Sequence, residues 1–143
     1  MGAVRQRILL IDDSKEDRFL IKQALANAAL DCEVMEAAEG EEADVRLQRH
    51  VGAGDMPHFV LLDLNLPKRS GLELMETWSQ KGFTKLTRVI VLSSLLTEAQ
   101  VVKLENLGAW LVIEKPRDLN EFLELGRRVK ELSLGDWQAP LAS

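Results

Sequence analysis

The amino-acid sequence predicts an α/β fold, a doubly wound, five-stranded parallel sheet with helices on both faces. Short runs rich in leucine and β-branched residues alternate along the chain with longer stretches of helical period. Three of the short runs, at 8–11, 59–62 and 89–92, are unbroken apolar segments, as in strands that helices cover on both sides. The 143 residues suffice for one domain that hides a core without a disulfide or structural metal.

Strands and helices are expected to follow one another in strict alternation. The strands are expected at Arg7–Ile11, Cys32–Glu36, Phe59–Leu62, Arg88–Ser93 and Trp110–Ile113. The helices are expected at Lys15–Ala28, Glu41–His50, Gly71–Lys81, Thr97–Leu107 and Leu119–Leu132. Four helices begin with a capping pair. In such a pair a side-chain oxygen of the first residue accepts from a free helix N–H, and the side chain of the residue three positions later accepts from the backbone N–H of the first. These pairs are Ser14 with Asp17, Ser70 with Glu73, Thr97 with Gln100, and Asp118 with Glu121.

Between these elements, Val51–Pro57 is expected to be a flexible loop. Gly82 and Gly108 stand where helix-ending glycines belong. Four apolar residues are expected in the core: Phe19, Leu20, Leu25 and Val89.

Composition excludes several classes of function. The net charge of -5 argues against binding to nucleic acid, which needs a basic face. Cys32 is the one cysteine, so no internal disulfide forms, and it is expected to be a small apolar filler. His50 and His58 lack the companions of a metal site. No apolar run is long enough for a signal peptide or a membrane span, so a cytoplasmic protein without membrane association is expected.

Polar residues that could bind a ligand or take part in a reaction lie where the predicted strands end. Asp12 and Asp13 follow the first strand, Asp63 the third, Ser93 and Ser94 close the fourth, and Lys115 with Pro116 follows the fifth. In an open α/β sheet these ends meet at the ligand crevice. Three carboxylates there would raise one another's pKa values, and a Mg²⁺ ion, which prefers oxygen ligands and keeps several waters, would relieve the repulsion.

The charges suggest a role for each residue. Asp63 is expected to attack phosphorus and form an acyl phosphate. Asp13, Asp63 and the backbone carbonyl of Asn65 are expected to hold Mg²⁺, with Asp12 acting mainly through water. Lys115 would supply a positive charge to one phosphoryl oxygen and Ser93 a hydrogen bond to another.

These motifs together resemble a response-regulator receiver domain of the CheY-like family, over about Arg7 to Leu132. The matching residues are Asp12-Asp13-Ser14, Asp63-Leu64-Asn65-Leu66-Pro67, Ser70-Gly71-Leu72-Glu73, Ser93 and Lys115-Pro116. The local sequence around Asp12 and Asp63 and the longer loop before the third strand resemble those of the stand-alone regulators that serve cyanobacterial and bacterial phytochrome kinases.

The resemblance implies a flavodoxin-like strand order, 2-1-3-4-5, and transfer of a phosphoryl group from a phosphohistidine of a sensor histidine kinase to Asp63. It implies a phosphoacceptor rather than an enzyme in the usual sense, and a cis peptide bond at Lys115-Pro116 that aims the lysine into the site. The expected division is a receiver domain over 1–132 and a tail over 133–143, without a fused output domain.

Two residues depart from the family pattern. Val112 occupies the position of an aromatic residue that changes rotamer on phosphorylation, and Trp110 is expected on the same face of the strand as Val112. Ser93 replaces the commoner threonine and keeps the hydroxyl. The predicted switch region also includes Ser94, Leu95 and Pro116. In the family, the positions of Leu95 and Asn65 flank the phosphoryl group. The phosphorylation chemistry is expected to be intact, whereas its transmission to the fourth helix, fifth strand and fifth helix stays open.

Taken singly, each site residue also fits helix capping or a turn. Three alternative functions remain: a phosphorylation-independent interaction module, a Mg²⁺-dependent phosphohydrolase and a flavin-binding protein. The hydrolase is disfavoured because Asn65 stands where its acid/base aspartate would be, and the flavin protein because no phosphate-binding loop follows the first strand. The broad apolar stripe of the last helix, with Trp137 and Leu141 of the tail, also predicts a homodimer through the face of the fourth helix, fifth strand and fifth helix.

Overall fold

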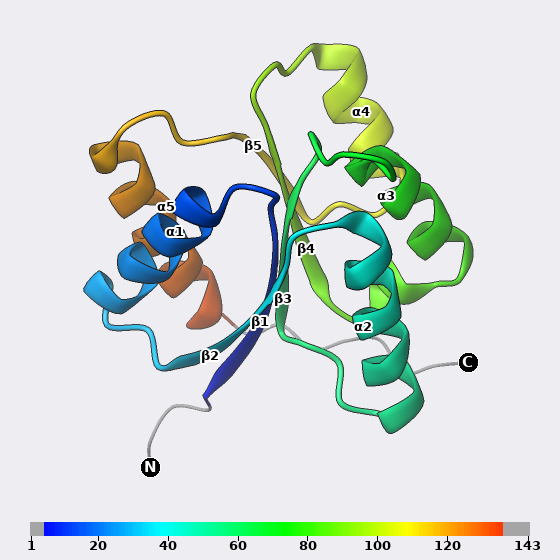
Figure 1. The fold of residues 1–143 in the computed structure, drawn as a ribbon, viewed down its shortest axis with the longest axis horizontal. Helices are drawn as coiled ribbons and strands as arrows, with labels where there is room; N and C mark the ends of the chain where they lie inside the picture. The colour runs from blue at the N-terminus through cyan, green and yellow to red at the C-terminus, as the bar shows by residue number, and fades with distance from the viewer. Residues whose placement is uncertain (1–4, 136–143) are drawn as a thin grey trace.

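The computed structural model describes residues 5–135 and confirms the expected fold class and strand order. Five parallel strands lie in the order β2-β1-β3-β4-β5 (Figure 1). The strands are β1 Gln6–Ile11, β2 Cys32–Ala37, β3 Phe59–Asp63, β4 Arg88–Ser93 and β5 Leu111–Glu114. The helices are α1 Lys15–Asn27, α2 Gly40–Ala53, α3 Gly71–Gln80, α4 Glu98–Asn106 and α5 Leu119–Ser133, with a short 3-10 helix η1 at Phe83–Lys85. The predicted tail contacts through Trp137 and Leu141 lie outside the described residues.

The sheet separates two hydrophobic cores, and Figure 1 shows α1 with α5 on one side and α2, α3 and α4 on the other. Ile8, Leu10, Phe59 and Leu61 face α1 and α5, while their neighbours along β1 and β3 face α2 and α3. Side chains alternate along a strand, so a strand covered on both sides must be apolar at every position. The runs at 8–11, 59–62 and 89–92 are therefore unbroken and apolar because helices cover both faces of their strands.

Helix α2 is longer than predicted. It continues to Ala53 and ends at Gly54, whose φ of 71° gives the left-handed conformation typical of a helix C-cap. Nothing before Gly54 breaks the helix, so the loop expected from Val51 begins only at Gly54. Strand β5 begins at Leu111 rather than at Trp110.

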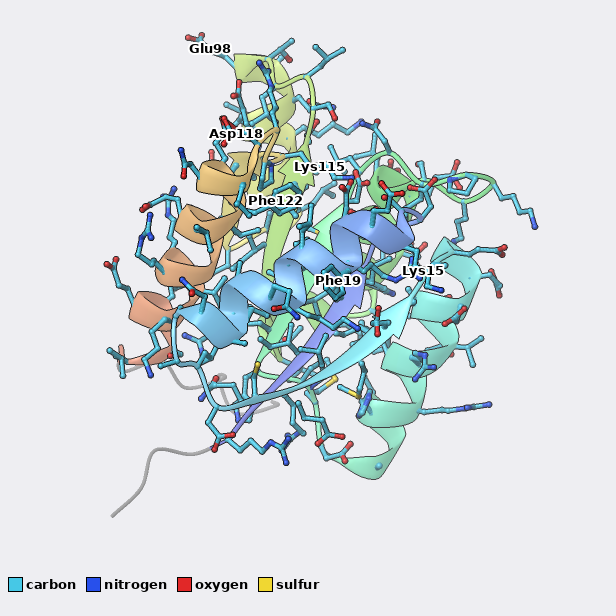
Figure 2. All side chains as sticks on the ribbon, turned by 60° about the vertical axis from the view of Figure 1, so that its left-hand side comes forward. Lys15, Phe19, Glu98, Lys115, Asp118 and Phe122 are labelled. Atoms are coloured by element: carbon cyan, nitrogen blue, oxygen red, sulfur yellow. The ribbon has the colours of Figure 1, made fainter. Side chains whose placement is uncertain are left out.

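The expectation that Phe19 belongs to the core is wrong. The residue is 56% exposed, whereas Leu25 and Val89 are buried and Leu20 is partly buried, as expected. The buried face of α1 is formed by Ile21, Ala24 and Leu25. Phe19 precedes Ile21 by two positions, about 200° around the helix, and so faces away from the sheet; Figure 2 shows it on the outer surface of α1.

Helices α1 and α5 touch through a glycine. A Cβ atom at Gly126 would collide with the carbonyl oxygen of Ala24 and lie 3.0 Å from its Cβ. The missing side chain therefore allows α5 to approach the backbone of α1. Among the described residues, no helix has the length and apolar character needed to cross a membrane.

Candidate active site and metal centre

The carboxyl ends of the central strands bring the predicted residues together. Asp12 follows β1 directly, and its N–H donates to the Ala37 carbonyl of neighbouring β2 (3.1 Å). Asp63 is the last residue of β3. Lys115 follows β5, and its N–H donates to the Ser93 carbonyl at the end of β4 (2.9 Å). Residues far apart in sequence thus meet at one edge of the sheet, as expected.

Three carboxylates form an acidic pocket at this edge. Ligand oxygens of Asp12, Asp13 and Asp63 all lie within 4.8 Å of one another. Asp12 and Asp63 are 0% and 1% exposed, while Asp13 is exposed at the mouth. Buried oxygen donors beside an open position suit a hard divalent cation that keeps some of its water, such as Mg²⁺. The donor set therefore fits the predicted metal.

Each buried carboxylate is held in the same way. One oxygen of Asp12 accepts the N–H of Ser14 (2.8 Å), and one oxygen of Asp63 accepts the N–H of Asn65 (2.9 Å). The second oxygen of each faces the ammonium of Lys115, at 2.9 and 2.8 Å. Both side chains are therefore fixed in orientation by the loop that follows their own strand.

Electrostatics set the protonation of the pocket. Burial raises the pKa of the Asp12 carboxyl above its ordinary value, and the hydrogen bonds from Lys115 and Ser14 offset only part of this effect. Burial alone would lower the pKa of Lys115, but its hydrogen bonds to Asp63, Asp12 and Asp17 raise it well above the ordinary range. Lys115 is therefore a firmly protonated ammonium.

The hydroxyl-bearing residues line the same edge. Ser93 is buried, and its Oγ donates to the carbonyl of Leu95 (3.3 Å). The Ser94 hydroxyl accepts from the Asn65 side chain (3.4 Å), which joins the loops after β3 and β4. Leu95 is 82% exposed. Both serines thus stand beside the acidic pocket, although the Ser93 hydroxyl is turned to its own loop.

Trp110 and Val112 do not share a face, contrary to the prediction. Val112 packs against the core under α2, α3 and α4. The Trp110 ring lies 5.5 Å from the guanidinium of Arg88, which itself stacks at 3.9 Å on Phe59 of the opposite core. Trp110 precedes the regular strand, so the alternation of strand side chains does not extend to it.

The Lys115-Pro116 peptide bond is trans, and the expectation of a cis bond is wrong. The lysine is aimed at the pocket without it. The hydrogen bond from its N–H to Ser93 continues the pairing of β5 with β4 by one residue, and the side chain then reaches Asp63.

Comparison with known proteins gives the family. The profile of the response regulator receiver domain matches residues 8–126. The chain belongs to this family. It is 29% identical over 137 residues to the response regulator Rcp1 of Synechocystis, covering 94% of this chain and 93% of the relative.

Two solved structures share the fold over nearly the whole receiver domain. One is the phosphorylated cyanobacterial phytochrome response regulator RcpA, with a TM-score of 0.82, 29% identity and coverage of 96% of this chain and 99% of RcpA. The other is the Mn²⁺-bound form of Rcp1, with a TM-score of 0.80, 28% identity and coverage of 94% and 99%.

Sequence reasoning missed a polar network that holds the loop after Asp63 in this receiver domain. Arg69, in the loop that follows Asp63, donates to Asp44 of α2 (2.8 Å) and to Thr77 of α3 (3.0 Å). The Trp78 indole N–H donates to the other oxygen of Asp44 (2.9 Å). Burial would raise the pKa of Asp44, but the hydrogen bonds from Trp78 and Arg69 hold it below its ordinary value. The network anchors the loop after Asp63 to two helices.

The sequence carried a signal for this network. Asp44 lies between Ala43 and Leu47 on the buried face of α2, and an acid there needs buried partners. The sequence alone does not identify Arg69 and Trp78 as those partners. The contact of Asp17 with Lys115 (2.9 Å) is also absent from the sequence prediction, because the capping pair of Asp17 with Ser14 is a sufficient local explanation for an acid at this position.

Proposed function

We propose that this receiver domain accepts a phosphoryl group on Asp63 from a phosphohistidine of a sensor histidine kinase. The observation that carries the proposal is the environment of Asp63. Its buried carboxylate is fixed by Asn65 on one oxygen and Lys115 on the other, beside two further carboxylates that suit a divalent cation. A receiver domain of this kind is a phosphoacceptor and not an enzyme in the usual sense.

The transfer would use the residues as follows. An Asp63 oxygen attacks phosphorus as the bond from phosphorus to the histidine nitrogen breaks, and the electron pair leaves with the imidazole. Asp12, Asp13, Asp63 and the Asn65 carbonyl would hold Mg²⁺, which when bound neutralises charge on the phosphoryl oxygens. Lys115 would turn its ammonium from Asp63 to a phosphoryl oxygen, and Ser93 would turn its hydroxyl from Leu95 to another. The Mn²⁺-bound form of the relative Rcp1 supports a divalent cation here.

The proposed kinase partner is of the phytochrome type. The support is similarity to Rcp1 and to the phytochrome response regulator RcpA over more than nine-tenths of this chain. An interaction module independent of phosphorylation is the competing function. The acidic pocket with its lysine argues against it, because such a module needs none of these buried charges.

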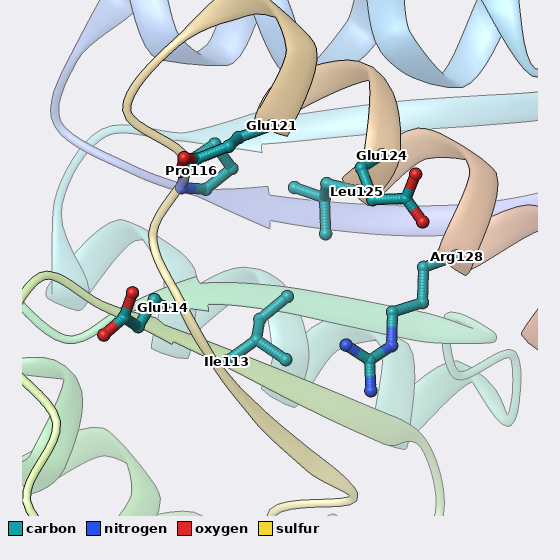
Figure 3. A pocket seen from close by; sticks show the side chains of 7 residues that line it. All are labelled: Ile113, Glu114, Pro116, Glu121, Glu124, Leu125 and Arg128. Carbon is teal, nitrogen blue, oxygen red and sulfur yellow. The ribbon is translucent and has the colours of Figure 1, made fainter.

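The proposed self-association uses the face of α4, β5 and α5. Three exposed apolar side chains belong to these elements or adjoin them: Val102 on α4 (55% exposed), Trp110 just before β5 (41%) and Leu119 at the start of α5 (62%). A hollow of about 220 Å³ lies between β5 and α5, where Ile113 and Leu125 meet a rim that includes Glu124 and Arg128 (Figure 3). Sedimentation velocity with and without a phosphodonor is expected to show a dimer in at least one condition, because a dimer would cover this surface. A monomer in both conditions would refute the proposal.

Intact-mass spectrometry tests the phosphoacceptor function. After incubation with acetyl phosphate and Mg²⁺, the protein is expected to gain one phosphoryl group, and to gain none when a chelator removes the cation. An unmodified protein is then incubated with beryllofluoride, which binds a phosphoacceptor carboxylate without a transfer step and so distinguishes rapid hydrolysis from failure. If neither modification nor beryllofluoride binding occurs, the interaction module becomes the better interpretation.

A further inference from the structure

Lys115 has a third carboxylate partner, outside the pocket that suits a cation. Its Nζ lies 2.9 Å from Asp17 Oδ2, as close as it lies to Asp12, and 2.8 Å from Asp63. The ammonium of Lys115 thus has three carboxylates within ion-pair distance, and Asp63 also accepts a hydrogen bond from it. Asp17 lies in the first turn of α1, with its side chain 29% exposed, whereas the side chains of Asp12 and Asp63 are almost completely buried.

The position of Asp17 is set by the start of α1. Its N–H donates to the Ser14 hydroxyl (3.1 Å), and the N–H of Ser14 donates to Asp12 (2.8 Å). In a reciprocal capping pair the side chain of Asp17 would accept a hydrogen bond from the backbone N–H of Ser14. Here Asp12 occupies that N–H, which leaves the Asp17 carboxylate to reach Lys115.

Two of the three partners of Lys115 also belong to the candidate cation site. Among the described residues, the carboxylates close enough to share a cation are Asp12, Asp13 and Asp63, and Asp17 is not one of them. A bound divalent cation would draw on the charge of Asp12 and Asp63 and would repel the ammonium beside it. Asp17 lies outside the cation site, so its electrostatic attraction to Lys115 is not shared with a bound cation.

We propose that Asp17 is a positioning residue that holds Lys115 in the site when a divalent cation occupies the acidic pocket. This inference rests on the proposed function, because that function supplies the cation. Without Asp17, the lysine depends on the same two carboxylates as the cation, and the two positive groups compete. The competition lowers affinity for Mg²⁺ and leaves the ammonium poorly placed for a phosphoryl oxygen.

Isothermal titration calorimetry with Mg²⁺ alone tests the proposal in a double-mutant cycle. Asp17→Asn is expected to weaken Mg²⁺ binding about fivefold, a coupling typical of residues in direct contact. Asp17→Glu keeps the charge and is expected to restore most of the affinity. Glu16→Gln is the matched control, because Glu16 is an exposed acid in the same helical turn, and screening limits its effect to less than about twofold.

The second half of the cycle removes the lysine. In a Lys115→Met background, where no ammonium competes with the cation, Asp17→Asn is expected to change Mg²⁺ affinity by less than about twofold. Circular dichroism checks that each variant is folded, and Lys115→Gln replaces Lys115→Met if the latter does not fold.

Three outcomes would overturn the inference. An Asp17→Asn variant that behaves like Glu16→Gln would show that the contact with Lys115 has no role. An equal loss with and without Lys115 would show that Asp17 acts directly on the cation. A parent protein without measurable Mg²⁺ affinity would overturn the proposed function and this inference together, whereas the first two outcomes leave the proposed function intact.

Discussion

An Asp63→Asn variant is expected to gain no phosphoryl group from acetyl phosphate and Mg²⁺, under conditions in which the parent protein is modified. The amide has no anionic oxygen to attack phosphorus, so the acyl phosphate cannot form. The variant is expected to fold, because the Asn side chain has the same shape and its oxygen can still accept the N–H of Asn65. It also removes one of three clustered acids that repel one another. Intact-mass spectrometry measures the result.

Asp55→Asn is the matched control for this loss. Asp55 lies between α2 and β3, is exposed, and pairs with His50 rather than with any residue of the pocket. The control is expected to be modified like the parent protein. If Asp63→Asn still gained one phosphoryl group, the acceptor would be another residue, and the roles proposed for Asn65 and Lys115 would be wrong.

A Gly126→Ala substitution is expected to lower the free energy of unfolding by about 2–3 kcal/mol, as overpacking of a well-packed contact does. The new methyl group would meet the carbonyl oxygen of Ala24, which is backbone and cannot rotate away. Helices α1 and α5 would have to separate, loosening the core they share with β1, β3 and β4. Urea denaturation measures the change.

The same substitution at Gly52 is the control. Gly52 lies inside α2, and nothing lies within 4 Å of the place where its Cβ would be. Gly52→Ala is therefore expected to raise the free energy of unfolding by about 0.5–1 kcal/mol through helix propensity alone. Opposite signs at the two positions would confirm that close helix packing, and not backbone freedom, explains Gly126. Stabilisation at both would contradict the contact.

The sequence predicted the fold because the two physical signals it uses are local. Unbroken apolar runs mark strands with two buried faces, and the capping pairs mark the helix starts at Lys15, Gly71, Glu98 and Leu119. Asp12, Asp63 and Lys115 could be predicted as one site because parallel strands bring their carboxyl ends to the same edge. Each of these inferences needs a strand boundary and no side-chain position.

The errors concern side chains whose direction depends on tertiary contacts. Phe19 is apolar, but the face of α1 that meets the sheet is set by Ile21 and Leu25. Trp110 lies outside the regular strand, so alternation gave it the wrong face. Asp17 looked like a capping residue, and only the position of Lys115, far along the chain, shows its second partner. When a local role already explains a residue, its sequence context gives no sign of a second partner far along the chain.

The contact between Asp63 and Lys115 spans 52 residues of chain, and this separation has a consequence for folding. Contacts between distant residues form after the entropy of closing long loops has been overcome. The charged pocket needs β1, β3, β4 and β5 in register, so no short fragment of the polypeptide contains it. While the chain is being synthesised, all of the carboxylates emerge from the ribosome before Lys115 does. The pocket proposed to accept a phosphoryl group is therefore complete only after the last strand has been made.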